Sequence, residues 1–345
     1  MRVLVAMSGG VDSSVAAALL AAEGHEVVGA TLKLWGGSGD LGCCSVADVD
    51  DARRVADQLG IEHRVFNFTD EFATGVVEPY VAAHAQGRTP NPCVECNRAV
   101  KFGHLADRAR RLGFDAIATG HHARVSVEGG RVRLRRGADR LKDQSYVLST
   151  LSARELARVL MPIGELTKPL VRELAGRFGL RTAAKPDSQD VCFIASRSPG
   201  LGRSAFLAER IPLHAGRVVD VATGAELGAL DAVELVTVGQ RRGLGVAVGD
   251  RRYAVRVDVA SATVFAGSRE DLLVGGVEFR ARTWFDVPVP TGSPVLAQAS
   301  AHGPARRAVV TSGGIEFHRP ERRVAPGQVV ACYVGDTVVG SGVAR

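Results

Sequence analysis

The first part of the chain contains the feature that most constrains its fold. An apolar run at residues 3–7 leads into the glycine-containing stretch 8–14, and an Ala/Leu-rich helical pattern follows at 13–23. A strand that turns through glycines into a helix is typical of the start of a parallel α/β unit. Backbone N–H groups in such a turn can approach an anion, which the helix N-terminus also favours. The sequence therefore predicts a parallel sheet with an anion site at its start.

Two local alternatives remain open for this turn. Asp12 could simply cap the helix, since Asp is favoured at that position, and a glycine turn after a strand is common in proteins that bind nothing there. The chain lacks the G-x-x-x-x-G-K-[ST] pattern, which disfavours a Walker-type ATPase.

The βαβ rhythm continues to about residue 200 and then changes. Further strands are predicted at 27–35, 64–68 and 116–119, with amphipathic helices between them. Beyond residue 200 the chain is Val-rich and punctuated by glycine, and short alternating runs at 216–221, 253–259 and 329–334 predict small antiparallel barrels. We expect domain boundaries near residues 200 and 270.

Charge and cysteine usage narrow the class of protein. Lys and Arg number 43 against 37 Asp and Glu, and this excess of +6 permits a polyanionic partner without requiring one. No apolar run approaches the roughly 20 residues of a membrane span, and no secretory signal is visible, so a cytoplasmic protein without a membrane partner is expected. Six cysteines in such a chain favour catalysis, metal binding or burial over a disulfide framework.

Two cysteines and a histidine are candidates for chemistry. Cys96 comes just before a helix expected to begin near Asn97, where the helix dipole would stabilise a thiolate, so Cys96 is the candidate nucleophile. Cys192 has apolar neighbours and by itself would be interpreted as a structural cysteine. His121, at a strand end, would by itself be interpreted as a packed or capping histidine.

The motifs taken together resemble a known family. Ser-Gly-Gly-Val-Asp-Ser at 8–13 is similar to the signature of ATP pyrophosphatases. The ordered set is Ser-Gly-Gly-Val-Asp-Ser, Gly-Arg-Thr-Pro-Asn-Pro before Cys-Asn, Ala-Thr-Gly-His, Lys-Asp-Gln-Ser-Tyr, Val-Cys-Phe-Ile and Gly-Gln-Arg-Arg-Gly-Leu-Gly. This set resembles the bacterial tRNA-specific 2-thiouridylases over nearly the whole chain. The resemblance implies an α/β fold with a parallel-sheet ATP pyrophosphatase domain (1–200), a small central domain (201–268) and a C-terminal antiparallel β-barrel that contacts tRNA (269–345).

The resemblance also implies site residues. The ATP-binding positions are Ala6, Met7, Ser8, Gly9, Gly10, Val11, Asp12, Ser13, Leu32 and Gly120. The tRNA-binding positions are His121, Lys142, Asp143, Gln144 and Gln328. Cys96 matches the family's nucleophile and Cys192 its persulfide-bearing cysteine.

The implied reaction is a sulfur transfer to tRNA. ATP, with Mg²⁺, would adenylate the C2 oxygen of the wobble uridine, and the Cys192 persulfide would then deliver sulfur to C2. A Cys96–Cys192 disulfide would remain to be reduced. The target base must leave the anticodon stack. Expected partners are tRNA and an upstream sulfur donor, either a cysteine desulfurase or a relay protein.

This chain departs from the family pattern at two places. Cys93 stands where Asp is common, and Ser300-Ala301-His302 stands where an Arg-Tyr pair is common. Cys93 could handle a proton in place of the carboxylate, could pack or cap the loop, or could join Cys96 and Cys192 as ligands of an iron–sulfur cluster. A cluster or a zinc site lacks a fourth ligand unless Cys43 or Cys44 supplies it.

A basic hairpin and two rival functions complete the sequence expectations. The hairpin arginines could contact phosphates or form a solvated charged face; they are Arg131, Arg133, Arg135, Arg136 and Arg140. Another adenylating enzyme of the superfamily, amidating or lysine-attaching, would not need two cysteines. An RNA-binding module whose cysteines hold a metal is the alternative from a different class.

Overall fold

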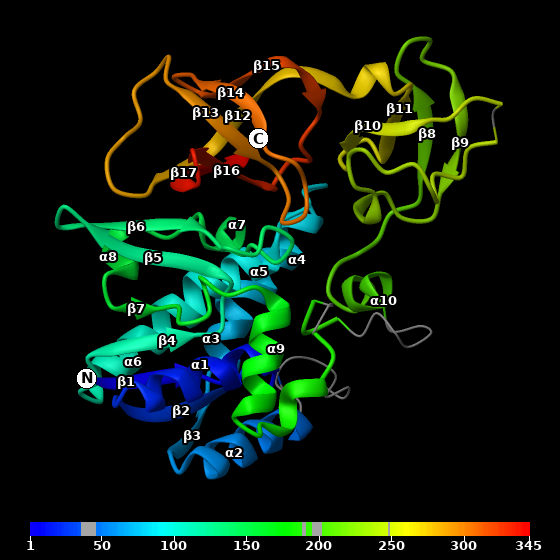
Figure 1. Ribbon diagram of the computed structural model, residues 1–345. Helices are drawn as coiled ribbons and strands as arrows, with labels where there is room; N and C mark the ends of the chain where they lie inside the picture. The colour runs from blue at the N-terminus through cyan, green and yellow to red at the C-terminus, as the bar shows by residue number, and fades with distance from the viewer. Residues whose placement is uncertain (36–45, 188–190, 195–201, 248) are drawn as a thin grey trace. The chain divides into compact units, whose positions relative to one another are not determined.

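The computed structural model divides into two compact units (Figure 1), and it describes residues 1–35, 46–187, 191–194, 202–247 and 249–345. The first unit comprises Met1–Val76, Cys93–Gly202 and Asp336–Val338. The second comprises Val77–Pro92, Arg203–Gly335 and Val339–Arg345. The predicted three-part division of the chain stays a prediction. Cys43, Cys44, Ser188, Gln189 and Asp190 lie outside the described residues.

The first unit is built on a parallel five-stranded sheet, which confirms the predicted α/β class. The strand order is β3-β2-β1-β4-β7, and each strand pairs with its neighbours in parallel. Its strands are β1 (Arg2–Ala6), β2 (Glu26–Lys33), β3 (Glu62–Asn67), β4 (Ala116–Thr119) and β7 (Val159–Leu160). β1 is central and its residues Val3, Leu4 and Val5 are fully buried. A central strand of a parallel sheet is covered on both faces, which explains its continuous apolar run.

Three helices share one core with this sheet. They are α1 (Val11–Ala22), α2 (Val46–Leu59) and α9 (Lys168–Arg177). Val15 and Ala16 of α1 and Val171 of α9 are fully buried in that core. Small residues on α1 allow close packing on the sheet, so the residues at its N-terminus are held in a fixed position against the ends of β1 and β4.

The remaining elements of the first unit are mostly short. The helices are α3 (Thr69–Phe72), α5 (Pro92–Glu95), η2 (Cys96–His104), α6 (Leu105–Arg111), α7 (Ser145–Leu148), α8 (Ala153–Leu156) and η3 (Arg181–Ala184). The strands β5 (Ala123–Glu128) and β6 (Arg131–Arg136) form an antiparallel hairpin through Gly129 and Gly130, both at positive φ. The helix η1 (Ala73–Val77) directly follows α3 in the chain.

The helix that carries the cysteines begins earlier than predicted. It starts at Pro92 rather than near Asn97, and α5, η2 and α6 follow one another without a gap from residue 92 to 111. Proline is well suited to the first helical position because its missing N–H is not needed there. Cys93 therefore occupies the first turn, and Cys96 lies one turn further on. The prediction that Cys96 lies at the N-terminus of this helix was wrong.

The second unit contains a small mixed sheet and a closed barrel. The sheet has the order β10-β11-β8-β9 and is built from β8 (Gly216–Asp220), β9 (Glu226–Leu230), β10 (Tyr253–Asp258) and β11 (Thr263–Gly267). The unit also has the helices α4 (Glu78–His84), α10 (Arg203–Ala208), η4 (Val233–Leu235) and η5 (Glu270–Leu272).

The barrel closes because its first strand pairs with its last. The order is β12-β15-β14-β13-β16-β17, and β12 also pairs antiparallel with β17. Its strands are β12 (Leu273–Trp284), β13 (Pro294–Gln298), β14 (Arg306–Val310), β15 (Gly314–Arg322), β16 (Val329–Val334) and β17 (Thr337–Ala344). Closure removes the exposed sheet edges. The expected C-terminal antiparallel barrel is confirmed.

Candidate active site

The turn between β1 and α1 has the form expected of an anion site. Gly10 is the N-cap of α1 and has an extended backbone, and as a glycine it has no side chain to occupy the helix N-terminus. Ser8 N–H donates to Ser13 Oγ at 3.2 Å, and Ser13 Oγ in turn donates to Gly10 O at 3.1 Å. The first N–H groups of the twelve-residue helix α1 are therefore available to phosphate oxygens.

Two glycines are required by packing around this turn. Gly9 has φ +71°, and a Cβ there would lie 2.3 Å from Asp48 O. Gly120 follows β4, and a Cβ there would lie 2.5 Å from the backbone nitrogen of Ser13. Because the backbone at residue 120 touches the start of α1, Gly120 shapes the turn. Leu32 and Met7, also predicted to bind ATP, are buried.

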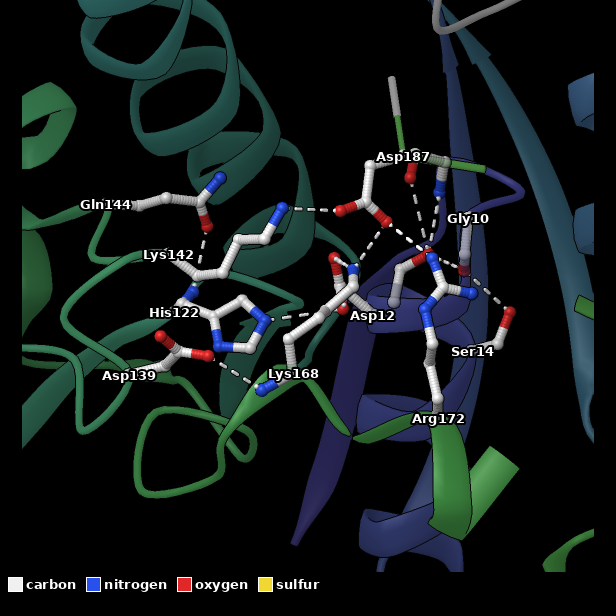
Figure 2. A network of polar contacts seen from close by, with 12 residues as sticks. Gly10, Asp12, Ser14, His122, Asp139, Lys142, Gln144, Lys168, Arg172 and Asp187 are labelled. Carbon is white, nitrogen blue, oxygen red and sulfur yellow. Dashed lines mark hydrogen bonds and ion pairs between the residues drawn. The ribbon is translucent and has the colours of Figure 1, made fainter. Parts of the chain in front are cut away.

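Asp12 does not cap α1 but takes part in an ion cluster with Lys168 (Figure 2). The Lys168 ammonium donates to both carboxylate oxygens of Asp12, at 2.8 and 2.7 Å. His122 Nε2 lies 3.4 Å from the same carboxylate. Burial raises the pKa of Asp12, but hydrogen bonds from His122 and Lys168 outweigh it and hold this pKa below its usual value. The alternative in which Asp12 is a helix cap was wrong.

Asp187 lies on the other side of Lys168. Its carboxylate is 2.8 Å from the Lys168 ammonium, 2.8 Å from that of Lys142 and 2.9 Å from the Arg172 guanidinium. Burial raises the pKa of Asp187, but the hydrogen bonds from Lys142 and Lys168 dominate and lower it to about 2. Asp187 therefore stays ionised at neutral pH, and a single ammonium links two carboxylates (Figure 2).

The two histidines after Gly120 are both buried. His121 Nδ1 lies 2.8 Å from Thr119 Oγ1, and its ring is 5.8 Å from that of Phe102. Burial, followed by the nearby charge of Lys101, lowers the pKa of His121 to about 3. His121 is therefore neutral at physiological pH and packed against η2.

The Lys142-Asp143-Gln144 triplet divides into exposed and buried side chains. Asp143 is buried, accepts hydrogen bonds from Gly137 N, Ser145 N and Ser145 Oγ, and forms a 2.8 Å ion pair with Arg136. Gln144 is exposed, and its Oε1 accepts from His122 N at 2.8 Å. The carboxylate of Asp143 is thus used inside the protein, whereas Lys142 and Gln144 border the ion cluster.

The hairpin arginines are not equivalent. The side chain of Arg136 is only 12% exposed, and Arg135 pairs with Glu128 at 2.8 Å. Arg131 and Arg140 are exposed. The solvated-face alternative therefore does not describe Arg136, which neutralises Asp143 inside the unit.

The cysteines are distributed on two segments. Cys93 is exposed, Cys96 is 8% exposed, and Cys192 is half-buried. Phe193, next to Cys192, packs against Phe72 of α3 with ring centroids 5.6 Å apart, and α3 contacts η2, which carries Cys96. The second cysteine segment is thus anchored to an element that also touches the first.

The iron–sulfur alternative requires Cys93, Cys96 and Cys192 to lie together as ligands. Within the described ranges, no group of three or more His, Cys, Asp or Glu side chains is arranged to hold a metal ion. Cys93, Cys96 and Cys192 do not form such a group among these residues, and Cys43 and Cys44 lie outside the described residues.

Gln328 belongs to the second unit. Its side-chain amide donates to Thr89 O at 2.7 Å, and Thr89 N–H donates to Pro326 O at 2.7 Å. The segment that precedes the cysteines in the chain is thereby hydrogen-bonded to the residues just before β16. The tripeptide 300–302 contains two exposed residues, Ser300 and His302.

Sequence reasoning did not assign roles to Lys168 and Arg172. Their only local signal is a Thr-Lys-Pro start to a helix with an Arg four residues later. Nothing in that pattern indicates that the chain returns to Asp12, 156 residues earlier.

Known families and individual proteins are similar to this chain over nearly its whole length. Residues 1–196 match a family described as "tRNA methyl transferase HUP domain", 204–268 a "tRNA methyl transferase PRC-barrel domain", and 297–344 an "Aminomethyltransferase beta-barrel domain". The chain is 48% identical over 99% of its length to the "tRNA-specific 2-thiouridylase MnmA" of Mycolicibacterium paratuberculosis, covering 98% of that protein.

A second relative and one solved structure are also similar to this chain. The protein of that name from Mycobacterium tuberculosis is 47% identical, with 99% of this chain and 95% of that protein covered. Among solved structures, NMN synthetase from Francisella tularensis is a distant match, at 19% identity over 54% of this chain and 66% of that one, with a TM-score of 0.36. None of the helices in the described part of the chain is both long and apolar enough to cross a membrane.

Proposed function

Because the chain belongs to the family of tRNA-specific 2-thiouridylases, we propose that it is a sulfurtransferase that uses ATP to convert a tRNA uridine to 2-thiouridine. The observation that carries the proposal is the glycine turn at the N-terminus of α1 with the Lys168 ion cluster beside it. Such a site suits the phosphates of ATP, and the two cysteine segments supply sulfur chemistry that an adenylating enzyme alone would not need.

The first step is adenylation of the wobble uridine. The C2 oxygen of the base attacks the α-phosphorus of ATP, the bond to the β-phosphate oxygen breaks, and pyrophosphate leaves while the N3 proton of the base passes to solvent. The turn residues Ser8–Ser13 bind the phosphates, and α1 contributes its N-terminal N–H groups. The carboxylate of Asp12, 31% exposed, is a suitable oxygen ligand for the Mg²⁺ that accompanies ATP.

The second step is sulfur transfer. The terminal sulfur of a Cys192 persulfide attacks C2, and the Cys96 thiolate attacks the Cys192 sulfur and breaks the S–S bond. AMP then leaves, the sulfur remains on C2, and a Cys96–Cys192 disulfide is formed. A dithiol reductant restores both thiols. Burial of Cys96 and partial burial of Cys192 protect these groups from water and unrelated oxidants.

Recognition of tRNA involves the exposed groups next to the site. Lys142 and Gln144 border the ion cluster, and Gln328 lies in the second unit. His121 and Asp143 are both buried, and they support this recognition from inside the first unit. Domains 1–200, 201–268 and 269–345 would provide adenylation, connection and tRNA contact. The sulfur comes from a cysteine desulfurase, directly or through a relay protein, in the cytoplasm.

One reconstituted assay tests this function. Purified protein is incubated with ATP, Mg²⁺, unmodified tRNA and a persulfide donor, and the tRNA nucleosides are then analysed by mass spectrometry. We expect 2-thiouridine to appear, with one pyrophosphate released per thiolated tRNA. Pyrophosphate release that is not accompanied by 2-thiouridine would instead indicate another adenylating activity. Binding of tRNA without any pyrophosphate release would identify a binding module.

A further inference from the structure

The turn that follows the hairpin of β5 and β6 presents an apolar side chain to solvent. Leu141 is 86% exposed, more than any other large apolar side chain in the described part of the chain. A single exposed leucine needs no explanation by itself. Leu141 differs from such a residue in two respects, which are the hydrogen bonds that hold its backbone and the cations on either side of it.

The backbone around Leu141 is held by one aspartate. Asp139 Oδ1 accepts from Leu141 N–H at 3.0 Å, and Asp139 O accepts from Lys142 N–H at 3.1 Å. The second carboxylate oxygen, Oδ2, accepts from Lys168 N–H at 2.9 Å and ties the turn to the start of α9 (Figure 2). An Asp side chain that bonds the backbone two residues on is a common way to fix a turn. An apolar side chain on a fixed turn loses little conformational entropy when a partner covers it.

The loop that carries this turn is also closed at its base. Asp143 is buried and accepts from Gly137 N–H and from Ser145 N–H, each at 3.0 Å. The segment 137–145 is therefore anchored inside the first unit on both sides of Leu141, while Leu141 itself remains outside. Its exposure follows from the way the loop is built.

Leu141 lies between two cations beside the candidate active site. Arg140 is exposed, and the Lys142 ammonium forms a 2.8 Å ion pair with Asp187, in the segment that leads to Cys192. Basic side chains attract the phosphates of a nucleic acid and fix its position. An apolar side chain between them is suited to the faces of unpaired bases, which stack on apolar and aromatic groups.

We propose that Leu141 is a wedge that packs against the base next to the target uridine and occupies the place in the stack that this uridine leaves. The assignment rests on the proposed function and deepens it, because the target base must leave the anticodon stack before it can react. Apolar side chains inserted between bases unstack them in other nucleic-acid complexes. Leu141 contacts a neighbouring base and not the reacting atoms, so it is a positioning residue.

The first test measures thiolation of two substrates. One is an unmodified tRNA transcript, and the other has an abasic nucleotide next to the target uridine, so that no base has to be separated from it on that side. We expect Leu141→Ala to lower kcat/KM on the ordinary transcript by about tenfold, the scale of burying a leucine side chain. On the abasic transcript Leu141→Ala should be within about twofold of the wild type, because the two changes remove the same contact. Leu141→Met should retain most of the activity on both.

The second test observes the base directly. In a tRNA whose target uridine is replaced by 2-aminopurine, the fluorescence increases when this base leaves the stack. At saturating protein the wild type should give an increase and Leu141→Ala a smaller one. The control is Val127→Ala, which removes a 68%-exposed apolar side chain from β5. It should match the wild type in both tests.

Equal kcat/KM for Leu141→Ala and the wild type on the ordinary transcript, or an equal loss on both transcripts, would overturn the assignment. Equal 2-aminopurine fluorescence in the two proteins would also overturn it. If Leu141→Ala does not fold, Leu141→Asn, which is similar in size but polar, is judged by the same criteria. A wild type that forms 2-thiouridine while Leu141→Ala is unimpaired rejects this inference alone, whereas a wild type that forms no 2-thiouridine on either transcript rejects the proposed function.

Discussion

At the scale of single residues, several predicted site residues are buried. Asp143 is enclosed by Arg136 and Ser145, and His121 is packed against Phe102. Their burial means that substitutions there perturb the fold as well as the site. The exposed or half-exposed residues, among them Lys142 and Cys192, are better suited to direct tests of chemistry.

The cysteine pair gives the first residue-scale prediction. Cys96→Ser and Cys192→Ser should each lower thiolation by roughly 10⁴-fold or more, as removal of a nucleophile does in other enzymes. Both should still release pyrophosphate, because adenylation uses the α1 turn and not a thiol. Nucleoside mass spectrometry and a pyrophosphate assay on the same samples separate the two steps. Full thiolation by Cys96→Ser would remove Cys96 from the mechanism.

Buried histidines predict how stability depends on pH. Burial lowers the pKa of His84 to about 4 and that of His121 to about 3. Below the unfolded pKa of about 6.5 the unfolded chain binds protons that the folded chain does not, so stability is complete above pH 6.5 and falls as the pH drops towards 4. Urea unfolding at pH 7.5, 6.0 and 5.0 should show this decline, and His84→Gln should make it shallower. If the free energy of unfolding depended on pH in His84→Gln as it does in the wild type, His84 would not be a cause of the decline.

At the scale of elements, the start of the helix at Pro92 changes the interpretation of Cys93. The residue is exposed in the first turn, where Asp is also favoured, so the family's common Asp and this Cys can occupy the same place. We interpret Cys93 as a proton-handling group.

This interpretation predicts that Cys93→Asp retains thiolation and that Cys93→Ala loses about 100-fold, the lower range for general acid–base catalysis. Rates of 2-thiouridine formation in anaerobically purified protein provide the measurement. Full activity in Cys93→Ala would indicate a packing role. Iron that co-purifies with the wild type and disappears in Cys93→Ala would indicate a cluster instead.

At the scale of the whole molecule, the charge balance indicates how tRNA is held. The excess of +6 is modest, so binding must depend on where basic side chains gather and not on the total. Arg140, which lies in the turn after the hairpin of β5 and β6, is exposed and suited to phosphate contact, whereas Arg136 is committed to Asp143.

We therefore predict that log K for tRNA falls linearly with log salt, with a slope of about −0.7 to −0.9 per contacted phosphate. Arg140→Gln should make the slope less negative by about one contact without changing stability. Arg136→Gln should destabilise the first unit, because it leaves the buried Asp143 carboxylate without its ion pair. Filter binding from 50 to 300 mM salt and urea unfolding measure the two effects. A slope that is unaffected in Arg140→Gln would exclude that arginine from the tRNA contact.

The sequence by itself determined the elements whose signals are local. The apolar run of β1, the glycine turn and the helical pattern of α1 lie between Arg2 and Ala22, and periodicity alone distinguishes strand from helix there. The alternating runs after residue 200 likewise predicted strands of the mixed sheet and barrel. The motif order indicated the family because each motif is a short contiguous stretch.

Only the tertiary structure decided which distant residues meet. Lys168 reaches Asp12 across 156 residues, and the segment Val77–Pro92, although it lies within the N-terminal half, belongs to the second unit. The sequence also did not indicate that Asp143 is buried in an ion pair with Arg136, because both residues lie in a stretch rich in charged side chains. The physical reason is that an ion pair or a buried contact depends on which distant segments of the chain meet in space. Hydrophobic periodicity indicates only the local element and the face that it buries.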